Sequence, residues 1–379
     1  MHNERFNRRR FLALSAAGIV AARFSGRASG QEPASVTPKV EEGVAWCDVQ
    51  QWGVEGRGWT ETKRYFDRLP AKAEGVVRPP VWGLSRHSAG MCVRFATDAT
   101  EISARYELLS PNLGMPHMPP TGVSGLDLYA QDDQGTWRWV AVTRPGAQAV
   151  KATFASNIPP GHRNYLVYLP LYNGVESLEI GVPADAAFEP VPPRTQGLIV
   201  YYGTSIAHGA CASRPGMAFP SILGRRLDRP VVNLAFSGNG RMDPEVVELL
   251  AELDTAVYCI DCLPNMQGPE VAERTEPLVH TLRKARPLAP IVLIEDRTYT
   301  NAWLLPSARQ RHAASRAALK TAYEKLKAEG VEGLYYVEGE YLLGDDDEGA
   351  TDGSHPSDLG MMRMADALEP VLRPILAGK

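Results

Sequence analysis

The sequence predicts an α/β fold in its C-terminal half, with a five-stranded parallel sheet flanked by helices, preceded by an all-β, jelly-roll-like sandwich. Two observations support this prediction. After about residue 195, continuous apolar runs alternate with helical stretches, which is typical of a parallel sheet covered on both faces. From about 76 to 185 the pattern is instead one of short strands separated by turns. We therefore predict a β domain at 31–190 and an α/β domain at 191–379.

Apolar composition defines the strands of the C-terminal half. Five segments are predicted as buried strands: "GLIVYYG", "PVVNLAF", "AVYCIDCL", "PIVLIED" and "GLYYVEG". Helices are predicted near 215–228, 243–253, 269–286, 306–329 and 356–377.

The β region contains a hairpin signal in "GLDLYAQDDQGTWRWVAV". Leu126, Leu128 and Ala130 alternate with polar residues before a turn at Asp133-Gln134-Gly135. By contrast, residues 31 to about 75 show no regular pattern, so we expect irregular structure there. The proline-bearing stretch 183–197 predicts a stiff linker.

The N-terminus has the features of an export signal. Arg8-Arg9-Arg10-Phe11-Leu12 fits the twin-arginine pattern, and small residues at Ala28-Ser29-Gly30 fit a cleavage site. The apolar segment between them is about a dozen residues long, too short to span a bilayer. We therefore predict that residues 1–30 are a twin-arginine signal peptide and that the mature protein is periplasmic or secreted, without membrane insertion. The alternative is a basic, disordered tail.

Charge and cysteine content exclude several classes of function. Beyond residue 30 the chain has 34 basic and 43 acidic residues, a net charge of −9, which argues against a nucleic-acid partner. Cys259 and Cys262 have redox-motif spacing but lie in a predicted strand, where residues three apart point to opposite faces. No second pair completes a zinc site. We expect structural cysteines and neither a metal nor an organic cofactor. The acidic stretch 344–349 predicts a solvated loop, with a calcium site as the alternative.

Chemistry-bearing residues follow the predicted strands, where active groups of parallel sheets lie. Ser205 follows the first strand, Gly238 the second and Asn265 the third, while Asp352 and His355 precede the last helix. A serine becomes a nucleophile when a base removes its proton. We predict His355 as that base, with Asp352 orienting its ring. The N–H groups of Ser205 and Gly238 and the amide of Asn265 are predicted to form an oxyanion hole. Each residue alone has an ordinary structural explanation, but coincidence explains their joint occurrence in a consistent order far less well.

The chain has neither a G-x-S-x-G nucleophile elbow nor a G-x-G-x-x-G dinucleotide motif after a strand. Instead, "YYGTSIAHG", "NLAFSGNG", "DCLPNM" and "DGSHPSDLG" resemble the four sequence blocks of the SGNH hydrolases, also called GDSL-type esterases. The resemblance implies a flavodoxin-like fold and a catalytic function for the five residues above. Thr204 and Met266 stand where that family often has aspartate. The stretch 125–129, Gly-Leu-Asp-Leu-Tyr, is similar to that of a bacterial branch with an N-terminal β domain.

These observations predict an exported serine esterase that hydrolyses small acyl esters, acetyl esters first, on a carbohydrate. The prediction of a carbohydrate substrate depends on export, on the family's frequent action on acetylated glycans and on the attached β domain. The alternatives are a lipid or thioester acylhydrolase and a catalytically inactive glycan-binding protein. His208 and Trp303 are predicted to contact the substrate, with ordinary packing as the alternative for each. The sequence does not determine the oligomeric state.

Overall fold

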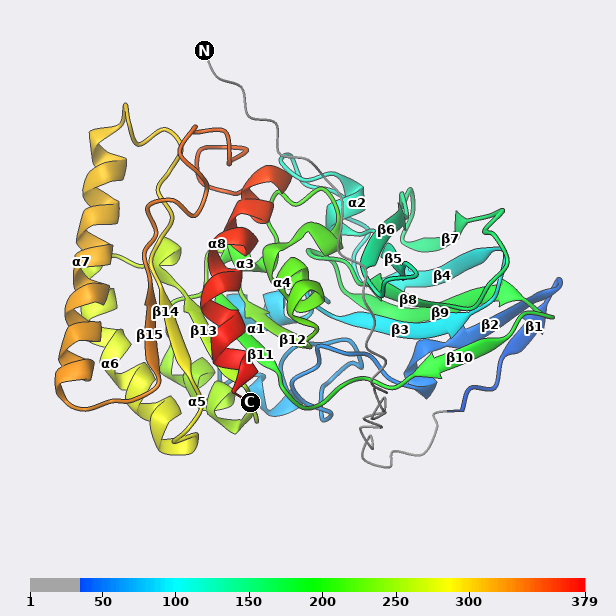
Figure 1. The fold of residues 1–379 in the computed structure, drawn as a ribbon, viewed down its shortest axis with the longest axis horizontal. Coiled ribbons are helices and arrows are strands. Elements are labelled where there is room, and N and C mark those ends of the chain that lie inside the picture. The colour runs from blue at the N-terminus through cyan, green and yellow to red at the C-terminus, as the bar shows by residue number, and fades with distance from the viewer. Residues whose placement is uncertain (1–34, 379) are drawn as a thin grey trace, which may run out of the picture. The chain divides into compact units, whose positions relative to one another are not determined.

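A computed structural model describes residues 35–378, which form three five-stranded sheets (Figure 1). The predicted signal peptide lies outside the described residues. Among the helices that are described, none is both long enough and apolar enough to cross a membrane. The β sandwich and the α/β part belong to one compact unit. The boundary near residue 190 therefore stays a prediction about domains.

Two antiparallel sheets pack face to face and form the β sandwich. Their orders are β1-β2-β9-β4-β7 and β10-β3-β8-β5-β6, and both inner faces contribute to one apolar core. Phe95 of one sheet and Ile180 of the other are both fully buried there. The strands of the first sheet are β1 (Lys39–Glu41), β2 (Val44–Asp48), β9 (Val175–Pro183), β4 (Ile102–Leu108) and β7 (Ala149–Ala155). Those of the second are β10 (Phe188–Val191), β3 (Cys92–Thr97), β8 (Arg163–Tyr168), β5 (Asp127–Gln131) and β6 (Trp137–Val142).

The structure confirms one local prediction in the sandwich and corrects two. The hairpin at 127–142 is present, with Gly135 in its turn at φ +77°. However, residues 31–75 are not wholly irregular, because β1 and β2 extend the first sheet. The stretch 183–197 is not only a linker, since β10 pairs with β3. Its Pro190 is tolerated because β10 is an edge strand.

The third sheet is parallel and has the order β12-β11-β13-β14-β15, as in doubly wound α/β folds. This confirms the predicted fold class. Its strands are β11 (Ile199–Gly203), β12 (Val231–Ala235), β13 (Val257–Asp261), β14 (Ile291–Ile294) and β15 (Leu334–Val337). The long helices are α4 (Phe219–Leu227), α5 (Pro244–Glu252), α6 (Gly268–Ala285), α7 (Pro306–Ala328) and α8 (Asp358–Ala377). A shorter helix, α1 (Pro79–Ser85), precedes β3.

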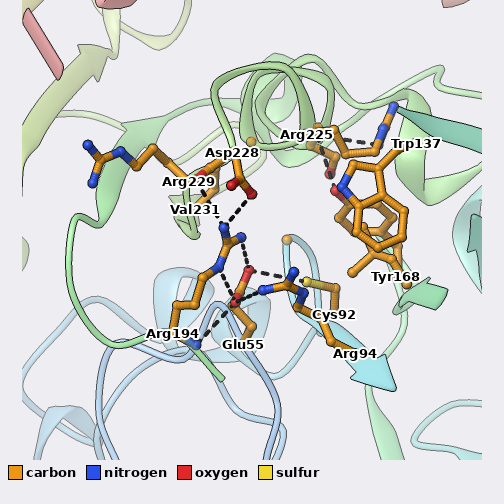
Figure 2. Close-up of a pocket in the computed structure, with 14 residues that line it drawn as sticks. Glu55, Cys92, Arg94, Trp137, Tyr168, Arg194, Arg225, Asp228, Arg229 and Val231 are labelled. Carbon is orange, nitrogen blue, oxygen red and sulfur yellow. Dashed lines mark hydrogen bonds and ion pairs between the residues drawn. The ribbon is translucent and has the colours of Figure 1, made fainter. Parts of the chain in front are cut away.

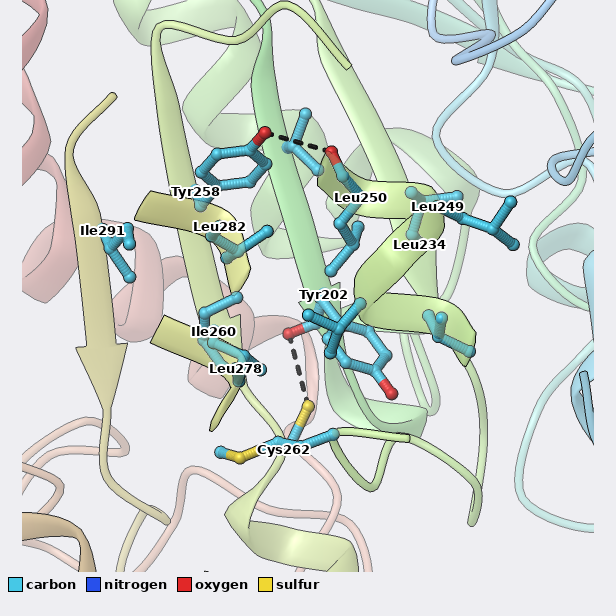
Figure 3. Close-up of a cluster of buried hydrophobic side chains, with 14 of the residues drawn as sticks. Tyr202, Leu234, Leu249, Leu250, Tyr258, Ile260, Cys262, Leu278, Leu282 and Ile291 are labelled. Carbon is cyan, nitrogen blue, oxygen red and sulfur yellow. Dashed lines mark hydrogen bonds between the residues drawn. The ribbon is translucent and has the colours of Figure 1, made fainter. Parts of the chain in front are cut away.

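Helices cover both faces of the parallel sheet. On one face, Tyr202 and Tyr258 pack among leucines that include Leu250 of α5 and Leu282 of α6 (Figure 3). On the other face, Tyr201 and its neighbours pack against α4 and α8. Burial on both sides explains why these strands are continuously apolar in sequence. All five cysteines are buried free thiols.

Residues 125–129 attach the sandwich to the α/β part. The Asp127 carboxylate is fully buried and accepts hydrogen bonds from Arg214 Nη1 at 2.9 Å and from the Gly216 N–H at 2.8 Å. A Cβ on Gly216 would lie 2.4 Å from the Tyr129 ring, so the backbone at Gly216 packs directly against that side chain. Residues 125–129 therefore form part of the contact that joins the sandwich to the α/β part.

An ion-pair network anchors the segment that joins the two parts. Arg194 donates to both carboxylate oxygens of Glu55, at 2.8 and 2.7 Å, and to Asp228 at 2.7 Å (Figure 2). Glu55 is only 4% exposed. The cavity that these side chains line, about 20 Å³, has room for roughly one water molecule. A two-pronged arginine–carboxylate pair of this kind fixes geometry as well as charge.

Candidate active site

Ser205 lies directly after β11, at the first residue of the short helix α3 (Ser205–His208). The Gly203 carbonyl at the end of β11 accepts the Phe236 N–H at 3.0 Å, so the segment after β12 runs beside the serine. Thr204 is the N-cap, and its hydroxyl accepts the Ile206 N–H at 3.5 Å. Threonine is a good capping residue, which explains how it serves where related sequences have aspartate. Ser205 is 7% exposed.

The structure brings Ser205, His355 and Asp352 together in series. Ser205 Oγ lies 2.8 Å from His355 Nε2, and His355 Nδ1 lies 2.8 Å from Asp352 Oδ2. The other carboxylate oxygen accepts the backbone N–H groups of Ser354 at 3.0 Å and His355 at 2.7 Å. The carboxylate therefore holds both the ring and the backbone of the histidine.

Hydrogen bonding keeps Asp352 ionised. Partial burial acts to raise the pKa of this carboxyl group, but the bonds donated by the His355 backbone, the His355 ring and the Ser354 backbone outweigh burial and lower the pKa to about 2. A carboxylate that stays charged at every working pH stabilises an imidazolium next to it and fixes the tautomer of the neutral ring.

Asn265 and the segment after β12 lie against the residues that precede the serine. A Cβ on Gly240 would lie 2.0 Å from the Gly203 carbonyl oxygen and 3.1 Å from the Thr204 nitrogen, so glycine is required there. The Gly240 N–H donates to Asn265 Oδ1 at 3.2 Å. Because the amide oxygen is used in this way, the amide NH₂ group of Asn265 is left to act as a donor.

Gly238 lies on the same segment in a left-handed conformation, with φ +68°. No atom lies within 4 Å of where its Cβ would be, so the space beside it is open. Within residues 35–378, no acceptor takes its N–H group. These features leave the Gly238 N–H free to meet a ligand, as the predicted oxyanion hole requires. That function for Ser205, Gly238 and Asn265 stays a prediction.

The two predicted substrate contacts lie in different surroundings. His208 is fully buried, stacks on Tyr172 with ring centroids 4.2 Å apart and bonds through Nε2 to the Leu171 carbonyl at 2.8 Å. Burial lowers the pKa of His208 well below its usual value, so the ring is neutral. Its complete burial favours the alternative that His208 is an ordinary packing residue. Trp303 is 67% exposed, on a turn whose Thr300 N–H donates to the Gly353 carbonyl at 3.0 Å.

The sequence analysis did not identify two residues that hold the site. Arg297, 2% exposed, donates to the Ser354 carbonyl at 3.0 Å and to the Ser354 hydroxyl at 2.6 Å, directly before His355. Tyr172, from the sandwich, donates to the Ser205 carbonyl at 3.2 Å. One signal was present for Arg297, because it follows a fully apolar strand at the sheet edge where the active groups gather. Tyr172 had no comparable signal.

A hydroxyl, an imidazole and a carboxylate in series, at the carboxyl edge of a parallel sheet, make up the arrangement that performs acyl transfer through serine. Comparison with known proteins agrees with this class. The GDSL-like lipase/acylhydrolase family model matches residues 196–373, and the model for the N-terminus of SGNH-hydrolase-type esterases matches residues 44–188.

A Bacteroides ovatus protein assigned to the GDSL-like lipases has a crystal structure that is 35% identical, with a TM-score of 0.84, over 88% of this chain and 98% of that one. A salicylyl-acyltransferase from a tetracycline biosynthetic pathway is 18% identical, with a TM-score of 0.65, over 91% and 93%. An acetyl xylan esterase from Butyrivibrio proteoclasticus is 12% identical, with a TM-score of 0.54, over 88% and 99%. The last two show the fold alone. Comparison with curated protein sequences finds no match.

The chain belongs to the GDSL-like lipase/acylhydrolase family. It is an ester-hydrolysing enzyme of the SGNH type, preceded by the β region that its family branch carries.

Proposed function

We propose that the protein is an exported serine esterase that removes small acyl groups, acetyl first, from carbohydrate. One observation carries this proposal: the Ser205–His355–Asp352 series, with both side-chain hydrogen bonds at 2.8 Å. This geometry supports the proposal, because an imidazole within hydrogen-bond distance of a hydroxyl group can take its proton without rearrangement. It argues against an inactive glycan-binding protein, since binding alone needs no such series.

In the proposed cycle, His355 takes the proton of Ser205 while Oγ attacks the ester carbonyl carbon. The Ser205 and Gly238 N–H groups and the Asn265 amide donate to the oxyanion that forms. His355 then gives the proton to the leaving alcohol, and an acyl group remains on Ser205. Water, deprotonated by His355, attacks this acyl-enzyme and releases the acid.

Two features support a carbohydrate ester as the substrate. The exposed indole of Trp303 lies on a turn bonded to the loop that carries His355, where its apolar face can stack on a sugar ring. A structure of the same fold belongs to an acetyl xylan esterase, which supports the choice by analogy only. Export through residues 1–30 would bring the enzyme to such polymers.

The proposed export has its own test. Changing Arg8 and Arg9 to lysine should retain the precursor in the cytoplasm.

The test is an ester panel with the purified enzyme. We expect turnover of p-nitrophenyl acetate faster than butyrate and far faster than octanoate, and acetate release from acetylated oligosaccharides or polysaccharides. Ser205→Ala, measured in parallel, controls for background hydrolysis. Preference for octanoate would replace this proposal with a lipid acylhydrolase. No turnover of any ester by well-folded protein would favour the binding protein.

A further inference from the structure

His117 of the β sandwich lies beside the imidazole of the proposed triad. The ring centroids of His117 and His355 are 6.0 Å apart, and the ring planes are inclined by 32°. The His117 side chain is exposed, and no residue in the described part of the chain bonds to its ring nitrogens. Both nitrogens are therefore available to a ligand that lies beside His355.

A tight turn holds His117 in this place. Pro116 and His117 form the two-residue tip between Met115 and Met118, whose N–H and carbonyl groups bond to each other in both directions at 3.0 Å. Proline restricts the backbone of the tip. Met118 is 2% exposed and packs in the apolar cluster that contains Ile206 of α3. The turn is thus seated on the same core as the helix that starts at the nucleophile.

The helix that follows the turn, α2 (Pro120–Val123), is also joined to the α/β part. Thr121 Oγ1 donates to the Ser213 carbonyl at 2.6 Å. A Cβ on Gly122 would lie 2.4 Å from the Ala212 carbonyl oxygen, so the two backbones are in contact. These contacts fix the position of His117 relative to the catalytic loops.

The chemistry of acyl transfer gives the site two sides. The leaving alcohol takes its proton from His355 Nε2, so the alcohol portion of the ester lies against that imidazole. The carbonyl oxygen lies instead against the oxyanion donors. A side chain next to His355, such as His117, is therefore within reach of the alcohol portion.

We propose that His117 hydrogen-bonds to a hydroxyl group on the alcohol portion of the ester, so that the β sandwich supplies a specificity residue to the active site. This inference rests on the proposed function and extends it. An imidazole offers a hydrogen-bond donor and, when neutral, an acceptor, which suits the hydroxyl groups of a sugar. The aryl leaving group of p-nitrophenyl acetate offers no such hydroxyl.

The test compares two acetyl esters that differ only in the alcohol: p-nitrophenyl acetate and the acetylated saccharide with the highest rate in the panel above. His117→Ala should lower kcat/KM on the saccharide by about 5- to 10-fold, the usual effect of losing one hydrogen bond. On p-nitrophenyl acetate it should change kcat/KM by less than about twofold. His117→Gln, which keeps a donor and an acceptor, should restore part of the loss.

The matched control is His162→Ala, which removes another exposed histidine of the sandwich, one that lies 3.4 Å from Glu189. This variant should leave kcat/KM unchanged on both substrates. Equal losses on both esters with His117→Ala would overturn the inference, because His117 would then act through His355. An unchanged rate on the saccharide would overturn it too, while leaving the esterase proposal intact. A wild-type enzyme inactive on every ester would instead overturn the proposed function and this inference with it.

Discussion

The serine of the proposed triad and its histidine–aspartate pair are held in place in different ways. Ser205 lies at the end of a strand with neighbours on both sides, is 7% exposed and follows the fully buried Thr204. His355 lies on a loop, with a side chain that is 26% exposed, next to an Asp352 side chain that is 44% exposed. The sheet positions the serine, whereas a few hydrogen bonds position the histidine.

This difference indicates where the site is rigid and where it is vulnerable. A change near Ser205 disturbs the sheet core and should affect folding as well as rate. A change near His355 disturbs a loop that is closed by the Thr351 N–H bond to the His355 carbonyl at 2.8 Å and anchored by Arg297. We expect such a change to lower rate with little effect on the fold. The following predictions test that contrast.

The largest effect is expected from removing either reacting group. Ser205→Ala and His355→Ala should each lower kcat by roughly 10⁶-fold, and the double variant should lose no more than either single one, because the two groups act as a unit. Thermal melts should show folded protein for all three, because Ser205→Ala removes only a hydroxyl group and leaves the packing of the sheet core in place. Activity of Ser205→Ala above about one hundredth of wild type would contradict the triad, in which the Ser205 hydroxyl is the nucleophile.

The next effect concerns the serine side. Asn265→Ala should lower kcat by about 10²- to 10³-fold through loss of an oxyanion donor. Asn265→Asp separates this from a structural effect, because aspartate can still accept the Gly240 N–H but has no amide donor. We expect the aspartate variant to be at least as slow as the alanine variant. Near-normal kcat with Asn265→Asp would limit Asn265 to supporting Gly240.

A smaller effect concerns the histidine side. Arg297→Lys keeps the buried positive charge next to Asp296 but lacks the planar guanidinium whose two nitrogens bond to Ser354, so kcat should fall by up to about 10²-fold as the imidazole shifts. Ser354→Ala should lower kcat by about tenfold or less. KM for p-nitrophenyl acetate should be unchanged in both.

Arg316→Lys is the control for that pair, because Arg316 bonds to the Asp296 carbonyl at 2.7 Å and to Thr298 but makes no bond to the 351–355 loop. It should leave kcat near wild type. If the Arg316 and Arg297 variants lose activity to the same extent, Arg297 has no special part in positioning His355.

The smallest effect is expected on the thermal stability of the folded protein at acid pH. The pKa of Asp352 is lowered from 3.8 to about 2 in the folded protein, so its ionised form contributes stability above about pH 4, which is lost as the pH falls towards 2. Asp352→Asn should therefore show a shallower fall in Tm between pH 4 and 2, by about one or two degrees, since the group is half exposed. Parallel Tm curves for the two proteins would contradict this.

The sequence predicted most of the parallel sheet and part of its site, for physical reasons. Strands buried on both faces are continuously apolar, so all five were recognisable, and each predicted site residue was found from its place after a strand or before the last helix. β10 was not recognisable, because it has only four residues, one of them Pro190. Arg297 could not be recognised by its partner, since Ser354 lies 57 residues further along the chain. His117 is still more remote from His355, and only the folded sandwich brings them together.

The contact made by Asp127 has a consequence for any attempt to divide the enzyme. Severing the chain between residues 191 and 196 would leave the Asp127 carboxylate on one fragment and its arginine partner, Arg214, on the other. The α/β fragment would also lose Tyr172, whose hydroxyl donates a hydrogen bond to the Ser205 carbonyl. Neither piece would then be an interchangeable module, and engineers seeking a minimal catalyst should keep both or redesign the seam.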